Sequence, residues 1–254
     1  MVEIENLNIN VNIFEILKDA FEEQFNRRKN KLGCSEIPFC ARKTIISRLY
    51  HIPITTNMKM LHGKIHHSII QKSKVLKRLI ESIDKQLEAI FKIYKTNKVI
   101  KEKVISFEIL EGRILEGHID IDTSEYIIEI KTTSIPLKFW SRKIAPFHYI
   151  QANTYLGLEK KQFGFILYIN LKAFESQVLD FDEIWKKYAC FITIPFDQEI
   201  FDLTMEKAKT MFLLMEKESF DIAGPEFEWE CKTCPKEIQE ICKKPKSQIQ
   251  IITQ

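Results

Sequence analysis

The stretch "GHIDIDTSEYIIEIKTT", residues 117–133, places acids inside two apolar strand patterns. Side chains along a strand alternate between its two faces, so Asp120 lies on the face opposite its neighbouring isoleucines. Glu129 and Lys131 likewise share one face of the second strand. A charge inside a strand costs free energy unless it is paired or bound to a ligand. We therefore expect the two carboxylates to share a partner.

The two strands are expected to form a hairpin that turns at Ser124 and Glu125. In that register Asp120 lies directly across from Glu129, with the Cβ atoms roughly 5 Å apart. A divalent cation between the carboxylates removes their repulsion, and hard oxygen ligands suit Mg²⁺ or Mn²⁺. Lys131 would then hold an attacking water or contact a phosphate oxygen. A different loop length would leave the acids diagonal, and a surface hairpin with ordinary cross-strand charges is the alternative interpretation.

The apolar patterns along the rest of the chain predict a mixed α/β fold. The chain has 254 residues, of which 45% are hydrophobic, enough for one large domain or a domain with an appendage. Helical spacing of apolar positions predicts helices at 10–30, 43–50, 58–71, 76–94, 148–160 and 197–218. Alternating or continuous apolar positions predict strands at 105–109, 114–121, 126–131, 163–171 and 188–196. This order predicts a mixed sheet with an N-terminal helical part.

Charge and cysteine usage narrow the class of protein. The net charge of +3 excludes a polycationic tail but permits a local basic groove. No stretch resembles a signal peptide or a membrane span, so we expect a cytoplasmic protein without a membrane partner. The cysteines then need a role other than extracellular disulfides. Cys231, Cys234 and Cys242 crowd near the C-terminus, and a tetrahedral sulfur site needs a fourth cysteine from elsewhere.

The acid and lysine pattern has a family resemblance. "GHIDI" followed by "EIK" resembles the core of RecB-like nucleases of the PD-(D/E)XK superfamily. "GKIHH" matches the G-x-x-x-H element of that family, which implies a metal-binding histidine at His67, or His66 if the helix register differs by one. "QANTY" matches its Q-x-x-x-Y helix, in which the two polar residues share a face. The resemblance implies metal ligands at His67, Asp120, Glu129 and the Ile130 carbonyl, and catalytic roles for Lys131, Gln151 and Tyr155.

A second resemblance concerns the cysteines. "SEIPFCARK", residues 35–43, resembles the S-x-I-x-x-C-P-R stretch of the CRISPR-associated Cas-four exonuclease family. Ala41 stands where that family usually has proline, and the spacing from Cys234 to Cys242 is longer than usual. In that family one early and three late cysteines hold an iron–sulfur cluster. The resemblance implies a cluster, 4Fe-4S or alternatively 2Fe-2S, on Cys40, Cys231, Cys234 and Cys242.

Other metal chemistry stays open for these cysteines. Zinc is the alternative occupant, and Cys34 is a weaker alternative ligand. Cys190 lies in an apolar strand pattern and is expected to be buried as a small hydrophobic side chain.

The resemblances together imply a restriction-endonuclease-type core with a cluster-bearing tail. The expected parts are an N-terminal helical part at 1–95, a nuclease core at 96–220 and an iron–sulfur tail at 221–254 that packs back on the N-terminal part. The implied function is a metal-dependent exonuclease on single-stranded DNA or DNA ends, which trims DNA for the CRISPR integrase during spacer acquisition. Candidates for a DNA-guiding groove are Arg42, Lys43, Lys138, Arg142 and Lys143.

Two other functions remain as hypotheses. A RecB-like nuclease of repair, or of a virus or mobile element, would keep the chemistry and change the biology. A catalytically idle DNA-binding or assembly module would change both, and the intact set of two acids and a lysine argues against it.

Overall fold

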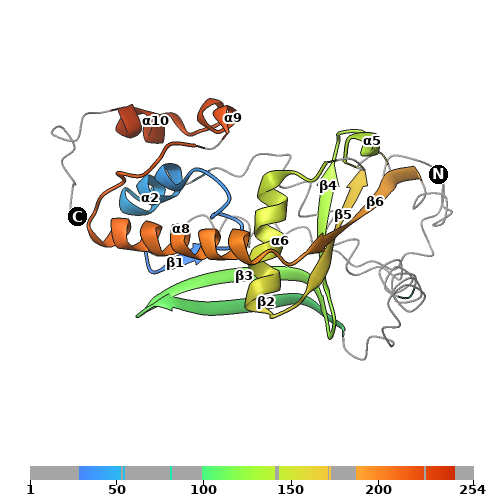
Figure 1. The fold of residues 1–254 in the computed structure, drawn as a ribbon. Coiled ribbons are helices and arrows are strands. Elements are labelled where there is room, and N and C mark those ends of the chain that lie inside the picture. The colour runs from blue at the N-terminus through green and yellow to red at the C-terminus, as the bar shows by residue number, and fades with distance from the viewer. Residues whose placement is uncertain are drawn as a thin grey trace, which may run out of the picture.

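The computed structural model describes residues 29–52, 54, 81, 99–140, 143–170, 172, 187–225 and 227–243. In these ranges a six-stranded mixed sheet is accompanied by helices (Figure 1). The predicted helices at 58–71, at 76–94 apart from Glu81, and at 10–30 apart from its last two residues lie outside the described residues. The predicted mixed α/β fold is confirmed.

The sheet combines parallel and antiparallel pairs. Its strands are β1 (Lys31–Gly33), β2 (Val99–Leu110), β3 (Arg113–Thr123), β4 (Ile127–Thr133), β5 (Phe163–Asn170) and β6 (Ala189–Pro195). They lie in the order β1-β3-β4-β5-β6, and β2 also pairs with β3. The pairs β1–β3 and β4–β5 are parallel, and the others are antiparallel. The sequence predicted every strand except β1, whose three residues are too few for an alternation.

The described helices are α2 (Ala41–Leu49), α5 (Leu137–Trp140), α6 (Pro146–Leu158), α8 (Gln198–Glu216), α9 (Glu228–Lys232) and α10 (Lys236–Lys243). The two long ones begin where the sequence predicts. Proline, which suits the first helical position, opens α6, and Asp197 caps α8 by accepting a hydrogen bond from the backbone N–H of Ile200 at 3.1 Å. The sequence did not predict α5, α9 or α10.

The turn between β3 and β4 is fixed by side chains. The hydroxyl of Thr123 donates to the carbonyl of Tyr126 at 2.8 Å and accepts from the backbone N–H of the same residue at 2.9 Å. The ammonium of Lys161 donates to the carbonyls of Thr123 and Ser124. The hairpin therefore turns at Ser124 and Glu125, as the sequence predicts.

The apolar core lies on both faces of the sheet. On one face, buried side chains of the sheet pack with those of α2, α6 and α8. A smaller cluster covers the other face and is built from Ile121, Tyr126, Ile128, Ile130, Phe165, Leu167 and Ile169. A Cβ at Gly157 would lie 2.3 Å from the ring of Phe201, so this glycine lets α6 approach α8 closely. No helix in the described ranges has the length and apolar character needed to cross a membrane.

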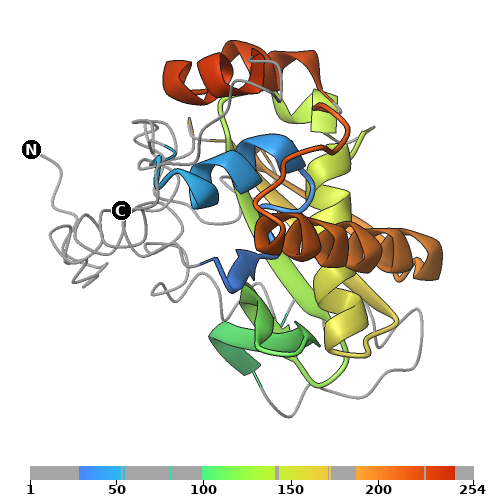
Figure 2. The ribbon, with the colours of Figure 1, turned by 90° about the vertical axis from the view of Figure 1, so that its left-hand side faces the viewer.

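The C-terminal helices return to the N-terminal part of the described chain. In both ribbon views α2 lies between α8 and the pair α9–α10 (Figures 1 and 2). We call the segment from Phe227 to Lys243, which contains α9 and α10, the lid. The lid therefore brings the late cysteines to the helix that follows Cys40.

Candidate active site

The two acids of the hairpin are buried where β3 and β4 stop pairing. The observed pairs are Ile121 with Ile128 and Asp122 with Ile127, which is the predicted register. One residue further along this register, Asp120 is level with Glu129, and both are buried. There the Oδ2 atom of Asp120 accepts a hydrogen bond of 2.7 Å from the backbone N–H of Ile130. A carboxylate thus takes the place of a strand carbonyl and is held beside the second acid.

A chain of hydrogen bonds connects the second acid to α6. The Nζ atom of Lys131 donates to Oε2 of Glu129 and to Oε1 of Gln151, both at 3.0 Å. The amide of Gln151 in turn donates to the hydroxyl of Tyr155 at 3.1 Å. The side chain of Glu129 is 2% exposed and that of Lys131 17%, so water screens their attraction weakly. The structure therefore brings together four of the residues that the sequence singled out.

The surroundings keep the neighbouring hydroxyl and thiol protonated. Burial, and then the charge of Glu129, raises the pKa of Tyr155 well above its usual range. The same two causes raise the pKa of the Cys34 thiol. A Cβ at Gly117 would lie 2.5 Å from the Tyr155 ring and 2.9 Å from the Cys34 sulfur, so a glycine is needed for both to pack on β3. Glu129 thus lies beside two neutral groups, the cation Lys131 and the second acid, Asp120.

His148 is a neighbour of the site that the sequence analysis missed. Its Nδ1 atom lies 2.9 Å from the hydroxyl of Tyr168, and Tyr168 is paired with Lys131 across the parallel strands β4 and β5. Burial, and then the charge of Lys131, lowers the pKa of His148 well below its usual range. His148 lies three residues before Gln151 on α6, so its helical spacing could have indicated that it belongs to the same face.

The acids suit a divalent cation by their chemistry, since both supply carboxylate oxygens. His67 and its alternative His66 lie outside the described residues. Within the described ranges, no group of three or more histidine, cysteine, aspartate and glutamate side chains is arranged to hold a metal ion. Asp120 and Glu129 are thus two members of the predicted ligand set. The metal roles of all four predicted ligands, with the Ile130 carbonyl among them, stay predictions.

The candidate DNA-binding residues fall into two places. Lys138 on α5 and Lys143 before α6 are exposed, and Arg142 between them lies outside the described residues. Arg42 is engaged within the protein, because its guanidinium donates to the carbonyl of Ile222 at 2.6 Å and to the sulfur of Cys242 at 3.6 Å. Lys43 on the same helix lies near the cysteines, where its charge acts on Cys234. Their contacts to DNA stay predictions.

The fold brings the two segments that carry the four predicted cluster cysteines into contact, through α2 and α10. Cys40 precedes α2, and the other three lie in the lid. Burial raises the pKa of Cys234 to about 11, and Cys40, Cys231 and Cys242 each add to this shift. Burial also raises the pKa of Cys40, with smaller contributions from Cys242 and Cys231. These contributions place the four thiols in one region of the fold, but among the described residues no three of them are arranged to hold a metal ion. Their role as ligands of an iron–sulfur cluster or of zinc stays a prediction.

The remaining two cysteines lie elsewhere. Cys34 and Tyr155 both pack over Gly117 on β3, and the leading causes of the raised pKa of Cys34 are burial and the charge of Glu129. Cys190 is half-buried on β6 and packs against the core, so it is more exposed than the sequence predicts.

A carboxylate anchors the lid to the segment that carries Cys40. The Oε1 atom of Glu230 accepts a hydrogen bond of 2.8 Å from the backbone N–H of Cys40, a residue 190 positions earlier. Its Oε2 atom is buried and has no hydrogen-bond partner among the described residues. This contact and the hydrogen bonds of Arg42 therefore hold the C-terminal part of the described chain against the segment that carries Cys40.

Comparison with known proteins gives similarity in structure only. No protein-family model and no curated protein matches the chain. The crystal structure of SSO0001 aligns over 91% of this chain and 96% of its own, with a TM-score of 0.50 and 18% identity. The crystal structure of an alkaline exonuclease (LHK-Exo) from Laribacter hongkongensis in complex with dAMP aligns over 78% of this chain and 93% of its own. Its TM-score is 0.46 and its sequence identity is 15%.

A third similar structure is a phage-related exonuclease from Haemophilus somnus 129PT. It covers 70% of this chain and 82% of its own, with a TM-score of 0.41 and 15% identity. The alignment with SSO0001 spans nearly the whole of both chains, so the chain shares the fold of that protein.

Proposed function

We propose that the chain is a metal-dependent nuclease that hydrolyses phosphodiester bonds of DNA, acting on single strands or ends. One observation carries the proposal. Two buried acids and a half-buried lysine meet at the point where β3 and β4 separate, and Gln151 on the neighbouring helix, itself bonded to Tyr155, holds the lysine. Such a group is costly to bury without a function, since burying ionised groups carries a desolvation penalty that their mutual attraction does not always offset.

The residues of the site have distinct roles in this reaction. A divalent cation bound by Asp120, Glu129, the Ile130 carbonyl and His67 would stabilise the charge that develops on the phosphate and lower the pKa of the attacking water. Lys131 orients that water or contacts the phosphate. The hydrogen bond from Ile130 N–H fixes the orientation of Asp120.

Gln151 and Tyr155 act on the lysine rather than on the substrate. The amide oxygen of Gln151 accepts from Lys131, and its nitrogen donates to the tyrosine. A raised pKa keeps Tyr155 neutral, so it accepts this bond without adding a second negative charge beside Glu129. The helix therefore restricts the ammonium to one position, as an oriented catalytic group requires.

We further propose that Cys40, Cys231, Cys234 and Cys242 bind an iron–sulfur cluster. The four thiols come from both ends of the described chain and affect one another's pKa. Thiolate ligands are typical of such clusters, and zinc on the same thiols is the second candidate. The cluster would fasten the lid to α2 beside the nuclease site.

The biological setting proposed from the family resemblance is CRISPR spacer acquisition, with the CRISPR integrase as partner. A nuclease of repair or of a virus or mobile element would have the same site. The third candidate, an idle DNA-binding module, is disfavoured by the ion pair of half-buried Lys131 with buried Glu129.

An assay with linear and circular DNA tests the proposed activity. Purified protein is incubated with end-labelled single-stranded DNA and with closed circular DNA, in Mn²⁺, in Mg²⁺ or in chelator. We expect degradation of the linear strand with metal, none with chelator, and intact circles. Equal degradation in chelator would contradict metal dependence, and cleavage of the circles would contradict an action on ends.

A further inference from the structure

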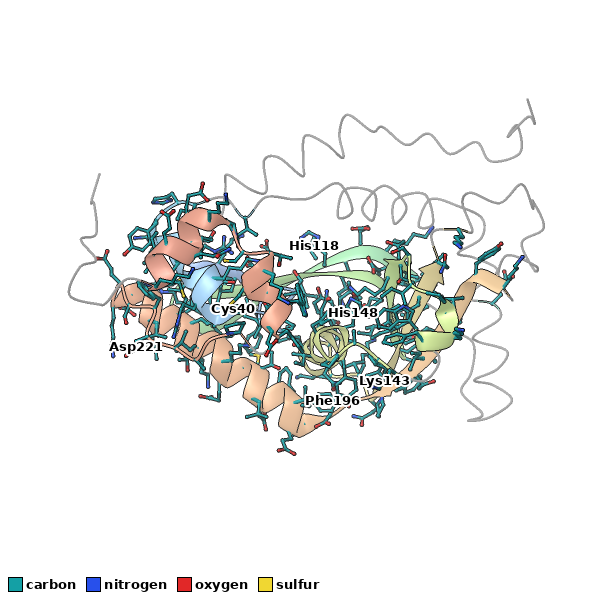
Figure 3. All side chains as sticks on the ribbon, turned by 90° about the horizontal axis from the view of Figure 1, so that it is seen from above. Cys40, His118, Lys143, His148, Phe196 and Asp221 are labelled. Carbon is teal, nitrogen blue, oxygen red and sulfur yellow. The ribbon has the colours of Figure 1, made fainter. Side chains whose placement is uncertain are left out.

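α6 presents a row of polar side chains to the sheet, and its first member has no role in the mechanism above. His148, Gln151 and Tyr155 have the spacing i, i+3 and i+7, which places them along one face of the helix. Gln151 bonds to Lys131, and the charge of Lys131 reaches His148. Figure 3, which views α6 along its axis, shows His148 beside that helix.

The hydrogen bonds of Tyr168 decide which nitrogen of His148 carries the proton. The hydroxyl of Tyr168 accepts from the backbone N–H of Ala145 at 3.5 Å. Within the described part of the chain, the one acceptor in reach of its own proton is Nδ1 of His148, at 2.9 Å. The tyrosine therefore donates to Nδ1, and the proton of the neutral imidazole lies on Nε2.

Aromatic packing fixes the position of this imidazole. The ring of Tyr168 stacks on Trp140 with centroids 4.5 Å apart, and the indole N–H of Trp140 donates to the hydroxyl of Thr133 at 3.1 Å. The rings of Phe147 and His148 pack in a T-shaped arrangement, with their centroids 4.5 Å apart. A side chain held in this way can present its free nitrogen in one direction with little loss of entropy on binding.

The remaining nitrogen of the ring makes no hydrogen bond to the described residues. In the described ranges the single hydrogen bond of His148 is the one to Tyr168, and the residue is half-buried. Nε2 is on the side of the ring away from Nδ1 and carries the donor proton. A neutral donor beside the ammonium of Lys131 suits an anionic oxygen, because both groups stabilise negative charge.

We propose that His148 is a substrate-binding residue that donates its Nε2–H to a non-bridging oxygen of the phosphate to be cleaved, with Tyr168 as the positioning residue that sets its tautomer. The inference rests on the proposed nuclease function. It adds a neutral hydrogen-bond donor to the site, beside the charged Lys131.

The test combines three variants with sulfur-substituted DNA. His148→Phe keeps an aromatic ring and removes the Nε2–H donor. Tyr168→Phe keeps its ring and removes the hydroxyl that sets the tautomer of His148. The third variant carries both changes. His51→Asn is the matched control, since it removes an exposed imidazole at a residue with φ of 52°, which asparagine tolerates. Each protein is assayed in Mn²⁺ on single-stranded DNA whose terminal linkage carries sulfur at one or the other non-bridging position.

We expect His148→Phe to lower kcat/KM by about 10- to 100-fold, the usual cost of losing a hydrogen bond to a charged group. Tyr168→Phe should give a loss of a few fold, and the double variant should lose no more than His148→Phe. Sulfur at one of the two positions should slow the wild type more than it slows His148→Phe, because the variant has no bond there to lose. His51→Asn should behave as the wild type.

Two outcomes would overturn the inference. A folded His148→Phe with wild-type kcat/KM and wild-type sulfur effects would show that His148 only packs. If His148→Phe fails to fold, an unchanged sulfur effect in Tyr168→Phe decides against the inference. Asp120→Asn, assayed in parallel, separates this result from the proposed function. Activity in Asp120→Asn would contradict the proposed nuclease site itself. An inactive Asp120→Asn beside a fully active His148→Phe would contradict the role of His148 alone.

Discussion

The acid and lysine site and the cysteine lid are held together in different ways. In the first, the functional side chains bond directly to one another across two neighbouring strands and a helix. In the second, the cysteines make no disulfide, and other residues hold the lid against them, notably Glu230 and Arg42. The acid and lysine site is therefore organised by its own hydrogen bonds, whereas the lid is positioned by residues other than its cysteines.

Replacing the site lysine should have the largest effect. In Lys131→Met we expect cleavage to fall by about 1000-fold, because no amine orients the water or the phosphate. The unfolding free energy should also fall by about 3 kcal/mol, since Glu129 is left charged and buried. DNA cleavage rates and denaturant titrations measure the two effects.

A double variant separates the two effects. Glu129→Gln combined with Lys131→Met should recover stability without recovering activity, because the buried charge is gone and the catalytic groups remain absent. Lys209→Met, which removes a lysine paired on the exposed surface of α8, is the control. An active single variant would show that the hydrogen-bonded chain is only structural.

The next largest effect concerns the lid. Cys40→Ser should lose the brown colour and lower the unfolding free energy of the loaded protein by about 5 kcal/mol, if closing a loop of nearly 200 residues acts as a disulfide does. Cys190→Ser, a half-buried cysteine on β6, should keep the colour. Metal analysis and visible absorption show which metal is bound. Stoichiometric zinc without iron would contradict the proposed iron–sulfur cluster but not the proposed nuclease function.

The sequence predicted the acid and lysine site better than the lid for a physical reason. Alternation along β3 and β4 fixes which side chains share a face, so the pairing of Ile121 with Ile128 followed from the pattern. The i, i+4 spacing of Gln151 and Tyr155 likewise predicted that these two side chains share one face of α6, where they form a hydrogen bond. These are local periodicities, and a sequence displays them directly.

Contacts between distant segments leave no such pattern. The three residues of β1 are placed by parallel pairing to β3, some 80 residues later, and α9 and α10 are too short for a helical stripe. The hydrogen bond from Ile130 N–H to Asp120 forms only because β3 and β4 no longer pair at that point. His148 is tied to the site by its hydrogen bond to Tyr168, which lies on β5. The assignment of Cys40 to the three late cysteines came from family resemblance rather than from spacing.

A smaller effect should follow from loosening the anchor of the lid. Glu230→Ala leaves the buried N–H of Cys40 without its acceptor, which should cost about 1–3 kcal/mol of unfolding free energy. The cluster should also bleach faster in air. Glu228→Ala, an exposed neighbour on α9, should match the wild type. Equal bleaching rates in the two variants would show that Glu230 does not anchor Cys40.

The smallest effect is a pH dependence of the metal-free lid. The pKa of Cys234 is raised from 9.0 to about 11 in the fold, so the folded state holds this proton more tightly than the unfolded chain. The resulting stability is fully present below pH 9 and is lost as the pH rises towards about 11. Cys234→Ser should show a shallower fall over this window in urea titrations. Identical pH profiles would mean that the thiol is not buried by the lid.

A nuclease assay of Asp120→Asn tests the central claim most directly. Asparagine can still accept the hydrogen bond from Ile130 N–H, so the hairpin should stay in place while the charge that binds a cation is gone. On single-stranded DNA in Mn²⁺, the wild type and the exposed-surface control Asp202→Asn should degrade the strand, and chelator should stop both. We expect Asp120→Asn to be slower by about 1000-fold or more. Wild-type cleavage by a folded Asp120→Asn would contradict the account.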